Sequence, residues 1–444
     1  MRPVIRHFWL LVGLVFWAAG CAPPTPPPTS TPPATPAAQT QPTATPSPTL
    51  TPMPSATPTR PPLPTDTPSI VTITVWENLP PPQAEQLARD ITAFGGQFSQ
   101  YAVELTHFDT PEDFLAATRD NPADFDVVLA TPMLLARLVA QRQLAPMSDF
   151  FPPAFLDEFA AVTLLGATQN EQVWGLPETA GFHLLLFYNK SLVDTPPVTT
   201  ADLAEQAKTL TSGTQWGLGI NSFEPLWLVP WLTPFGGWLI NADDQPTLNT
   251  PAMVQALELV QGWQTPPNAV APVATYDEMQ SKFVAGNVAL MINGDWAVGE
   301  LRTSPELNWG VAPLPAVGSA DDNQPAASLV LAKYWAISRS ATAERALAAS
   351  AFVDFVTRPD RQLAWAAKFG TLPTRRDALN DPLIVNDAVR RVSAAQLLAG
   401  QSLPLGIDAN VLLDAMRGPL QQVLAGQLSP AKAAEQMQAN LESQ

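Results

Sequence analysis

The stretch FVAGNVALMINGDW, residues 283–296, decides the fold. Its apolar centre, Val288 to Ile292, predicts a strand. Gly294-Asp295-Trp296 follows at once and predicts a strand-to-helix turn, in which Asp295 can serve as the N-cap of the next helix. The stretch therefore predicts an α/β unit with a tryptophan at the turn that follows its strand.

The same alternation of short strands and amphipathic helices extends from this stretch back to Ser69. Residues 71–75 alternate as a strand, and residues 87–94 repeat at helical spacing up to Gly95-Gly96, where we expect the helix to end. Further strands are predicted at 103–105 and 125–129, the latter a buried parallel one. This order predicts a βαβ unit with right-handed crossovers.

A second set of the same kind begins near 183–188. Leu347, Ala351, Phe355 and Val356 form the stripe of a helix that stops before Pro359, and another helix should run from Pro359 to Gly370. No short internal repeat is present, so a solenoid or propeller is disfavoured. About 375 residues follow Ser69, which is enough for two or three domains.

The N-terminus has the features of an export signal. Arg2 and Arg6 accompany an apolar run that is too short to span a bilayer, so residues 1–20 are predicted to be a cleaved signal peptide. Cys21, the only cysteine, follows Ala18-Ala19-Gly20 and resembles the lipidated cysteine of bacterial lipoproteins, although Leu is usual where Ala18 stands. Diacylglycerol on Cys21 would anchor the protein to a membrane. The alternative is a plain secretory signal with an incidental cysteine.

Residues 21–68 are predicted to be a disordered tether. After Cys21 they are almost entirely Pro, Thr, Ser and Ala, with Arg60 and Asp66 the only charges, and cannot build a core. The whole chain carries a net charge of −17, which disfavours nucleic acid as a partner. We expect an exported protein on the outer face of the cytoplasmic membrane.

Several segments, taken in order, resemble the family of extracellular solute-binding proteins typified by the maltose-binding protein. The 283–296 stretch is the most specific of them. The others are Trp76-Glu77-Asn78, 124–131, Val173-Trp174-Gly175-Leu176-Pro177, Leu186-Phe187-Tyr188-Asn189-Lys190, 309–315 and 370–375. The resemblance covers essentially everything after the tether.

The resemblance implies an α/β periplasmic-binding-protein-like fold of type II. Two α/β domains would be joined by a multi-stranded hinge, with the ligand cleft between them. The first would comprise 69–180 plus 312–368, and the second 181–311 plus 369–444. Hinge closure on a ligand would then produce the shape that a transporter recognises.

The resemblance, together with the chemistry of sugars, suggests the site residues. Sugars need aromatic plates and hydrogen-bonding side chains. Asn78 and Thr131 follow strands at the carboxyl edge, where ligands of open α/β sheets bind. The full set of candidate ligand contacts is Trp76, Glu77, Asn78, Thr131, Glu224, Trp227, Trp231, Asp295, Trp296, Tyr334, Trp335 and Arg375.

Each candidate also has a structural interpretation. The tryptophans and Tyr334 can be core residues, Glu224 a solvated surface acid, and Arg375 part of a hinge salt bridge. Two places in the sequence depart from the family pattern. Leu226 stands where a member of the family has Tyr, and Ser328-Leu329-Val330 stands where many members have two glycines.

The implied function is the solute-binding component of an ABC importer for a mono- or oligosaccharide, acting as a monomer with the permease subunits as partners. A polyamine, peptide or iron chelate is an alternative solute, and a sensory role an alternative to transport. An exported hydrolase is disfavoured because His107 and His183 lack zinc-site spacing and Ser429-Pro430-Ala431-Lys432 lacks the companion motifs of its class. We expect no metal, no cofactor and no catalysis.

Overall fold

A computed structural model describes residues 69–121, 124–221, 223–264, 271–272, 274–318 and 323–443. The predicted signal peptide, Cys21 and the predicted tether lie outside these residues. The chain from Ile70 onward forms one compact unit. Within the described residues, no helix is both long and apolar enough to cross a bilayer.

The first sheet has five strands in the order β2-β1-β3-β13-β6. Both neighbours of β1 run parallel to it, whereas β13 is antiparallel to β3 and β6. The predicted βαβ order is therefore confirmed in β1-α1-β2. The strands are β1 (Val71–Glu77), β2 (Tyr101–His107), β3 (Val127–Ala130), β6 (Leu176–Gly181) and β13 (Leu331–Ile337).

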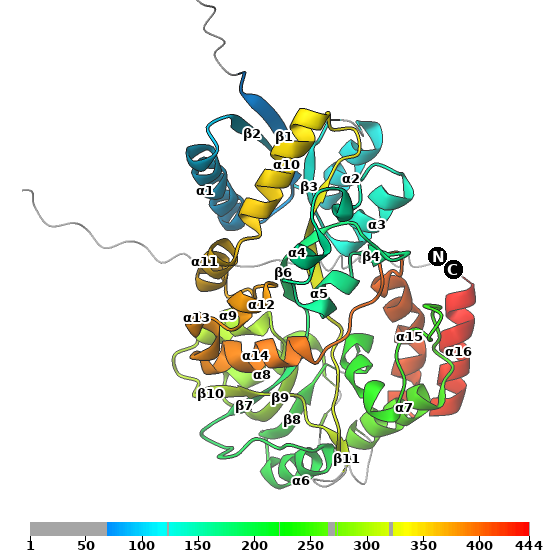
Figure 1. Ribbon diagram of the computed structural model, residues 1–444. Helices are drawn as coiled ribbons and strands as arrows, with labels where there is room; N and C mark the ends of the chain where they lie inside the picture. Colours follow the sequence, from blue (N-terminus) through cyan, green and yellow to red (C-terminus); the bar gives the residue numbers. More distant parts are fainter. Residues whose placement is uncertain are drawn as a thin grey trace, which may run out of the picture. The chain divides into compact units, whose positions relative to one another are not determined.

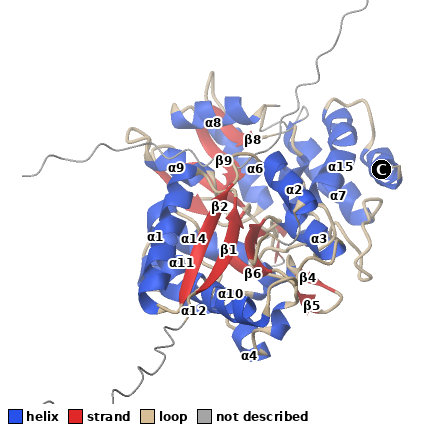
Figure 2. Cartoon of the chain, turned by 90° about the horizontal axis from the view of Figure 1, so that it is seen from above, coloured by secondary structure: helices blue, strands red, loops and turns tan. Residues whose placement is uncertain are grey.

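Helices cover both faces of this sheet, as Figure 2 shows, with α1 on one side and α2 and α3 on the other. In Figure 1, α10 lies along β1, against which it packs. The helices of this part of the chain are α1 (Pro81–Gln97), α2 (Pro111–Asp120), α3 (Pro132–Ala140), α4 (Pro153–Leu156), α5 (Ala161–Leu165), α10 (Ala343–Val356) and α11 (Pro359–Phe369), with the 3-10 turn η1 (Met147–Asp149) and the short strands β4 (Thr168–Gln169) and β5 (Gln172–Val173).

The second sheet has four strands in the order β10-β7-β9-β8. They are β7 (Leu184–Asn189), β8 (Trp216–Ile220), β9 (Val288–Gly294) and β10 (Trp309–Ala312), and β9 is the strand predicted within residues 283–296. β9 is an inner strand, paired with β7 on one side and β8 on the other, and it is buried along its whole length.

The other helices, 3-10 turns and short strands complete the structure. They are α6 (Thr200–Leu210), η2 (Pro225–Trp227), η3 (Val229–Trp231), η4 (Thr233–Phe235), α7 (Pro251–Gln264), α8 (Tyr276–Val284), α9 (Ala297–Arg302), β11 (Val317–Gly318), β12 (Asn323–Gln324), α12 (Arg376–Leu379), α13 (Pro382–Val385), α14 (Ala388–Leu398), α15 (Ala409–Leu424) and α16 (Pro430–Glu442).

The chain passes between the two sheets at Phe182-His183, which join β6 to β7, and again between β10 and β13. Additional bridges link Ala180 with Leu372 and Leu329 with Gln401 near these passages. The four sequence ranges assigned to two domains stay a prediction.

Two local predictions were wrong. Helix α1 does not end at Gly95-Gly96 but continues to Gln97, because both glycines face open space and the Phe98 ring packs on Phe94 at 4.9 Å. Leu347 does not belong to the buried stripe of α10: its side chain is 64% exposed. The end of α11 at Gly370 is confirmed, with that glycine in the left-handed conformation.

Candidate functional site

The turn after β9 is held by a buried amide network. Asn293 donates from Nδ2 to Gln280 Oε1 at 2.7 Å and accepts the Gly294 N–H on Oδ1 at 2.8 Å. Gln280 in turn donates to Glu300 Oε2 at 3.0 Å. These contacts tie the end of β9 to α8 and α9, so the residues after Gly294 start from a fixed position.

Trp296 folds back over Gly294. A Cβ atom at position 294 would lie 2.2 Å from the Trp296 ring, so this close approach requires glycine. The indole is half-buried. Its Nε1 donates to the Tyr276 hydroxyl at 3.1 Å, which fixes the plane of the ring.

Two more aromatic rings support this indole. Phe182 lies 5.4 Å from Trp296 between ring centroids, and Trp227 meets it edge to face at 6.1 Å. Trp227 is itself buried and donates from Nε1 to the Ile292 carbonyl at 2.7 Å. Trp296 thus presents a partly exposed plate that three aromatic neighbours hold in place.

Asp295 contacts the passage between the sheets. Its Oδ1 accepts the Phe182 N–H at 3.0 Å, and its own N–H donates to the His183 carbonyl at 3.0 Å. A Cβ atom on Gly181 would lie 2.4 Å from Asp295 Oδ2, so the carboxylate packs directly on this segment. Burial raises the pKa of Asp295 to about 7. A ligand contact at Asp295 stays a prediction, and its Oδ1 already accepts a hydrogen bond from the chain itself.

The passage itself is strained and enclosed. Phe182 has a φ of 69°, which is unfavourable for a non-glycine residue. His183 is fully buried, and burial lowers its pKa to about 3, so it is neutral. Its Nε2 lies 2.8 Å from Ser393 Oγ, whereas its Nδ1 has no hydrogen-bond partner among the described residues and lies 3.7 Å from Asp295 Oδ2.

Glu224 lies at the start of η2 and is 42% exposed. Arg417 of α15, 36% exposed, donates to its Oε2 and also to Asp414 Oδ1 at 3.0 Å. Since η2 carries Trp227, this ion pair is connected to the Trp296 cluster through one short turn. A polar pair with spare acceptor and donor atoms thus lies in the same part of the chain.

Asn78 and Thr131 lie at neighbouring carboxyl ends of parallel strands, as predicted, because β1 and β3 pair side by side. Both are half-buried. Thr131 also caps α3 by accepting the Leu134 N–H at 3.4 Å. Glu77 is fully buried, and its two oxygens accept from the Leu79 N–H and from His107 Nδ1, the latter at 2.9 Å.

Four of the five predicted tryptophans are buried, namely Trp76, Trp227, Trp231 and Trp335. Trp76 is 5% exposed and contacts Phe108 and Phe125 at 5.1 and 5.3 Å. Trp231 is fully buried, donates to the Trp227 carbonyl at 2.9 Å and meets Trp263 edge to face at 5.1 Å. Neither presents a ring face to a ligand in this structure.

The three remaining candidates are also enclosed. Tyr334 is fully buried, and its hydroxyl donates to the Thr163 carbonyl at 2.9 Å. Trp335 is fully buried, and its Nε1 donates to Glu178, a carboxyl whose pKa burial raises to about 8. Arg375 lies between two phenylalanine rings and pairs with Glu158. Tyr334 and Trp335 thus tie β13 to α5 and to β6, and Arg375 ties the start of α12 to the segment that follows α4.

The two departures from the family have structural roles here. Ser328 Oγ accepts the Leu184 N–H at 3.0 Å, so it fastens the start of β7 to the segment before β13. Leu226 is buried in the core of the second sheet.

Four residues at this site were not among the candidates: Phe182, His183, Tyr276 and Arg417. Tyr276 starts α8 after the capping Thr275, but nothing in its local pattern indicates that it reaches Trp296. Arg417 is 193 positions from Glu224, and helix periodicity alone cannot reveal such a pairing. Among the described residues there is no cluster of three or more His, Cys, Asp or Glu side chains that would hold a metal ion.

A sequence profile described as bacterial extracellular solute-binding protein matches residues 91–391. The maltotriose-binding protein of Pyrococcus abyssi (strain GE5 / Orsay) is 27% identical over 255 residues, which are 55% of this chain and 54% of that protein. The chain therefore aligns with only about half of that relative. The sn-glycerol-3-phosphate-binding periplasmic protein of Escherichia coli (strain K12) is 22% identical over 337 residues, 70% of this chain and 76% of that one.

Among solved structures, a cyclo/maltodextrin-binding protein complexed with maltotetraose superposes with a TM-score of 0.74 at 22% identity, covering 84% of this chain and 96% of that one. The maltose/maltodextrin-binding domain of Bdellovibrio bacteriovorus gives a TM-score of 0.66 at 23% identity, covering 84% and 99%. The predicted type II periplasmic-binding-protein fold is therefore confirmed.

Proposed function

The chain belongs to the family of bacterial extracellular solute-binding proteins, and from this premise we propose that it binds a carbohydrate by closing two α/β domains around it. The domains are 69–180 plus 312–368 and 181–311 plus 369–444. Closure shifts an open–closed equilibrium, and an ABC importer recognises the closed form. The protein acts outside the cytoplasm as a monomer, anchored by a lipid on Cys21.

The observation that carries this proposal is the fixed, half-buried indole of Trp296. Tyr276 holds its Nε1, Phe182 and Trp227 flank the ring, and the part of the indole that stays exposed can meet the C–H side of a sugar. Glu224 and Arg417 supply charged hydrogen-bonding groups for hydroxyls. Asn78 and Thr131 at the carboxyl edge of the first sheet supply polar groups from the other domain.

The state of the acids favours a sugar over a polyamine. An amine box would use Glu77, Glu224 and Asp295 as free carboxylates. Each of them already has a partner: His107 and Leu79 for Glu77, Arg417 for Glu224, and Phe182 for Asp295. A cation at Glu224 would also meet the positive charge of Arg417, whereas a neutral sugar can use the spare donor and acceptor atoms of this pair.

A thermal-shift panel tests the class of solute. We expect maltotriose or another neutral sugar to raise the unfolding temperature, because a ligand that binds only the folded state stabilises it by RT ln(1 + [L]/Kd). Glycerol 3-phosphate, spermidine and a tripeptide serve as comparison ligands. A rise in unfolding temperature with spermidine and none with any sugar would contradict the proposal. It would instead favour an amine site formed by the acidic side chains.

A further inference from the structure

A cavity lies apart from the residues proposed for the sugar site. Its volume is about 650 Å³, within the range of small-molecule pockets. Twelve of its thirteen lining residues come from the single segment Thr233–Ala252, and the other is Gln401. None of the sequence-predicted site residues is among them. All thirteen lining residues fall within the ranges predicted for the second domain, so none of the lining comes from the first.

The walls of this cavity are set by close backbone packing. Gly236 adopts the left-handed conformation, with φ 75°, and a Cβ atom on Gly237 would lie 2.3 Å from Ala252 Cβ. Thr233 Oγ1 accepts the Ala327 N–H at 3.0 Å, and the Gln401 N–H donates to the Ser328 carbonyl at 2.9 Å. Both rims are therefore fixed to the same neighbouring segment, so the cavity exists before any ligand arrives.

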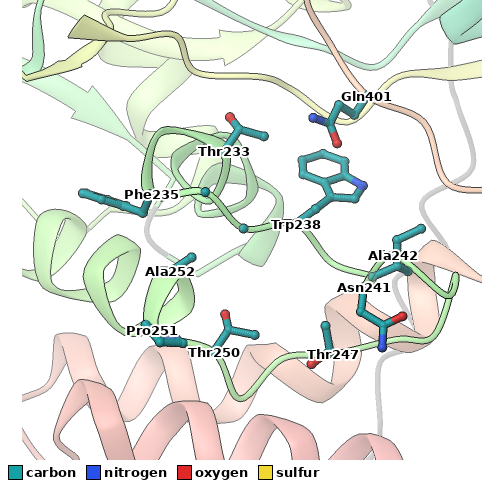
Figure 3. A pocket seen from close by; sticks show the side chains of 13 residues that line it. Thr233, Phe235, Trp238, Asn241, Ala242, Thr247, Thr250, Pro251, Ala252 and Gln401 are labelled. Atoms are coloured by element: carbon teal, nitrogen blue, oxygen red, sulfur yellow. The ribbon is translucent and has the colours of Figure 1, made fainter. Parts of the chain in front are cut away.

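The lining carries hydroxyls, amides and aromatic rings, and no ionisable side chain. In Figure 3 the Trp238 ring stands between Gln401 and the group formed by Asn241, Thr247 and Thr250. The Gln401 amide and the Thr247 hydroxyl make no hydrogen bond to any described residue, so both can serve a ligand. An uncharged pocket of this kind suits a neutral polyhydroxylated molecule and offers nothing to balance a charged one.

Trp238 adds a second, independent observation. Its indole Nε1 is buried and has no acceptor among the described residues. Buried indole N–H groups normally have a partner, and an unpaired one costs free energy. A hydroxyl of an occupant would supply the missing acceptor. The same ring offers a face for the C–H side of a sugar.

We propose that this cavity, formed by Thr233–Ala252 and Gln401, is a second binding site for a small neutral carbohydrate, independent of the site at Trp296. It holds the sugar by stacking on Trp238 and by hydrogen bonds to Gln401, Thr247 and Asn241. The proposal goes beyond the transport site, because a sugar can occupy this cavity while the Trp296 site is empty.

Fluorine NMR of the full chain labelled with 5-fluorotryptophan tests this, because each indole has its own signal, assigned by single Trp→Phe variants. Glucose and maltotriose are titrated into the wild type and into Trp296→Ala. We expect the Trp238 signal to shift and saturate in both, with the same half-saturating concentration. Gln401→Ala should raise that concentration at least threefold, whereas Gln427→Ala, an exposed matched control, should not.

The outcomes are distinct. A Trp238 signal that stays fixed at the highest soluble sugar concentration would overturn the second site, and so would a shift that disappears in Trp296→Ala. A silent Trp296 signal with a responding Trp238 signal would instead overturn the proposed transport site and leave this one standing. In Gln401→Ala, unchanged positions of the other indole signals report that the fold is intact.

Discussion

Phe182 and Asp295, 113 positions apart, are joined by a hydrogen bond of 3.0 Å from the Phe182 N–H to Asp295 Oδ1. The Asp295 N–H returns a bond to the next carbonyl, that of His183. The passage between the sheets and the turn that carries Trp296 are therefore one hydrogen-bonded piece. Any movement of the passage is transmitted to the indole that we propose as the sugar plate.

Removing the Asp295 carboxylate should loosen this piece. In Asp295→Ala the Phe182 N–H loses its acceptor, and we expect the free energy of unfolding to fall by about 1–3 kcal/mol. Asp295→Asn keeps an oxygen at the same place and should lose less. Urea denaturation of both variants measures this, and equal losses would show that the hydrogen bond is unimportant.

The pH dependence of stability should change in Asp295→Asn. The folded-state pKa of Asp295 is raised to about 7 from an ordinary value near 4, so the folded protein holds this proton to higher pH than the unfolded chain does. The contribution of Asp295 to stability is thus full below pH 4 and is lost as the pH rises to about 7.

The measurement is the difference in unfolding free energy between wild type and Asp295→Asn at several pH values from 4.5 to 7.5, chosen to span roughly this window. We expect wild type to lose stability relative to the variant as the pH rises. A difference that stays constant across the window would contradict the raised pKa.

Gly294→Ala should displace the indole without greatly changing the core. The new Cβ would lie 2.2 Å from the Trp296 ring, so the ring must move, which disturbs its hydrogen bond to Tyr276. We expect sugar affinity to fall at least tenfold, read out by titration calorimetry. Gly299→Ala is the matched control: it lies in α9 with nothing within 4 Å, and should keep the affinity and gain about 0.5–1 kcal/mol of stability.

Trp231→Ala should act on stability, since this indole is fully enclosed against Trp263. Removing such a side chain leaves a cavity, and we expect a loss of about 3–5 kcal/mol in the free energy of unfolding. Trp296→Ala removes a half-buried ring and should cost clearly less. Chemical denaturation of both variants makes the comparison, and a larger loss for Trp296→Ala would mean that its indole is the more important core residue.

The fold could be predicted largely from local patterns. The apolar run in 283–296 gave β9, and the alternation in 71–75 gave β1, because strand periodicity is written in neighbouring residues. The predicted end of α1 was wrong because the Phe98 ring packs on Phe94, and this contact outweighs the tendency of the two glycines to end the helix. The prediction that Leu347 is buried was wrong because a single apolar side chain can face solvent at little cost in free energy.

The site could be predicted only in part. The position of Trp296 at the turn after β9 could be predicted because that turn is local, and its contact with a ligand stays a prediction. Trp231, Tyr334 and Trp335 were predicted as ligand contacts from residue type and resemblance, but burial depends on how the sheets are covered. Tyr276 and Arg417 were missed because each of them contacts a residue that is distant in the sequence, and the spacing of residues along the chain does not indicate such a contact.

The central claim is that a sugar stacks on the Trp296 indole, and titration calorimetry of maltotriose tests it most directly. Trp216 provides the matched control, since it lies at the opposite end of the second sheet, beside the first residue of β9. We predict that Trp296→Ala weakens binding at least tenfold, about 1.4 kcal/mol, whereas Trp216→Ala binds like the wild type. Equal affinity for wild type and Trp296→Ala would contradict the claim.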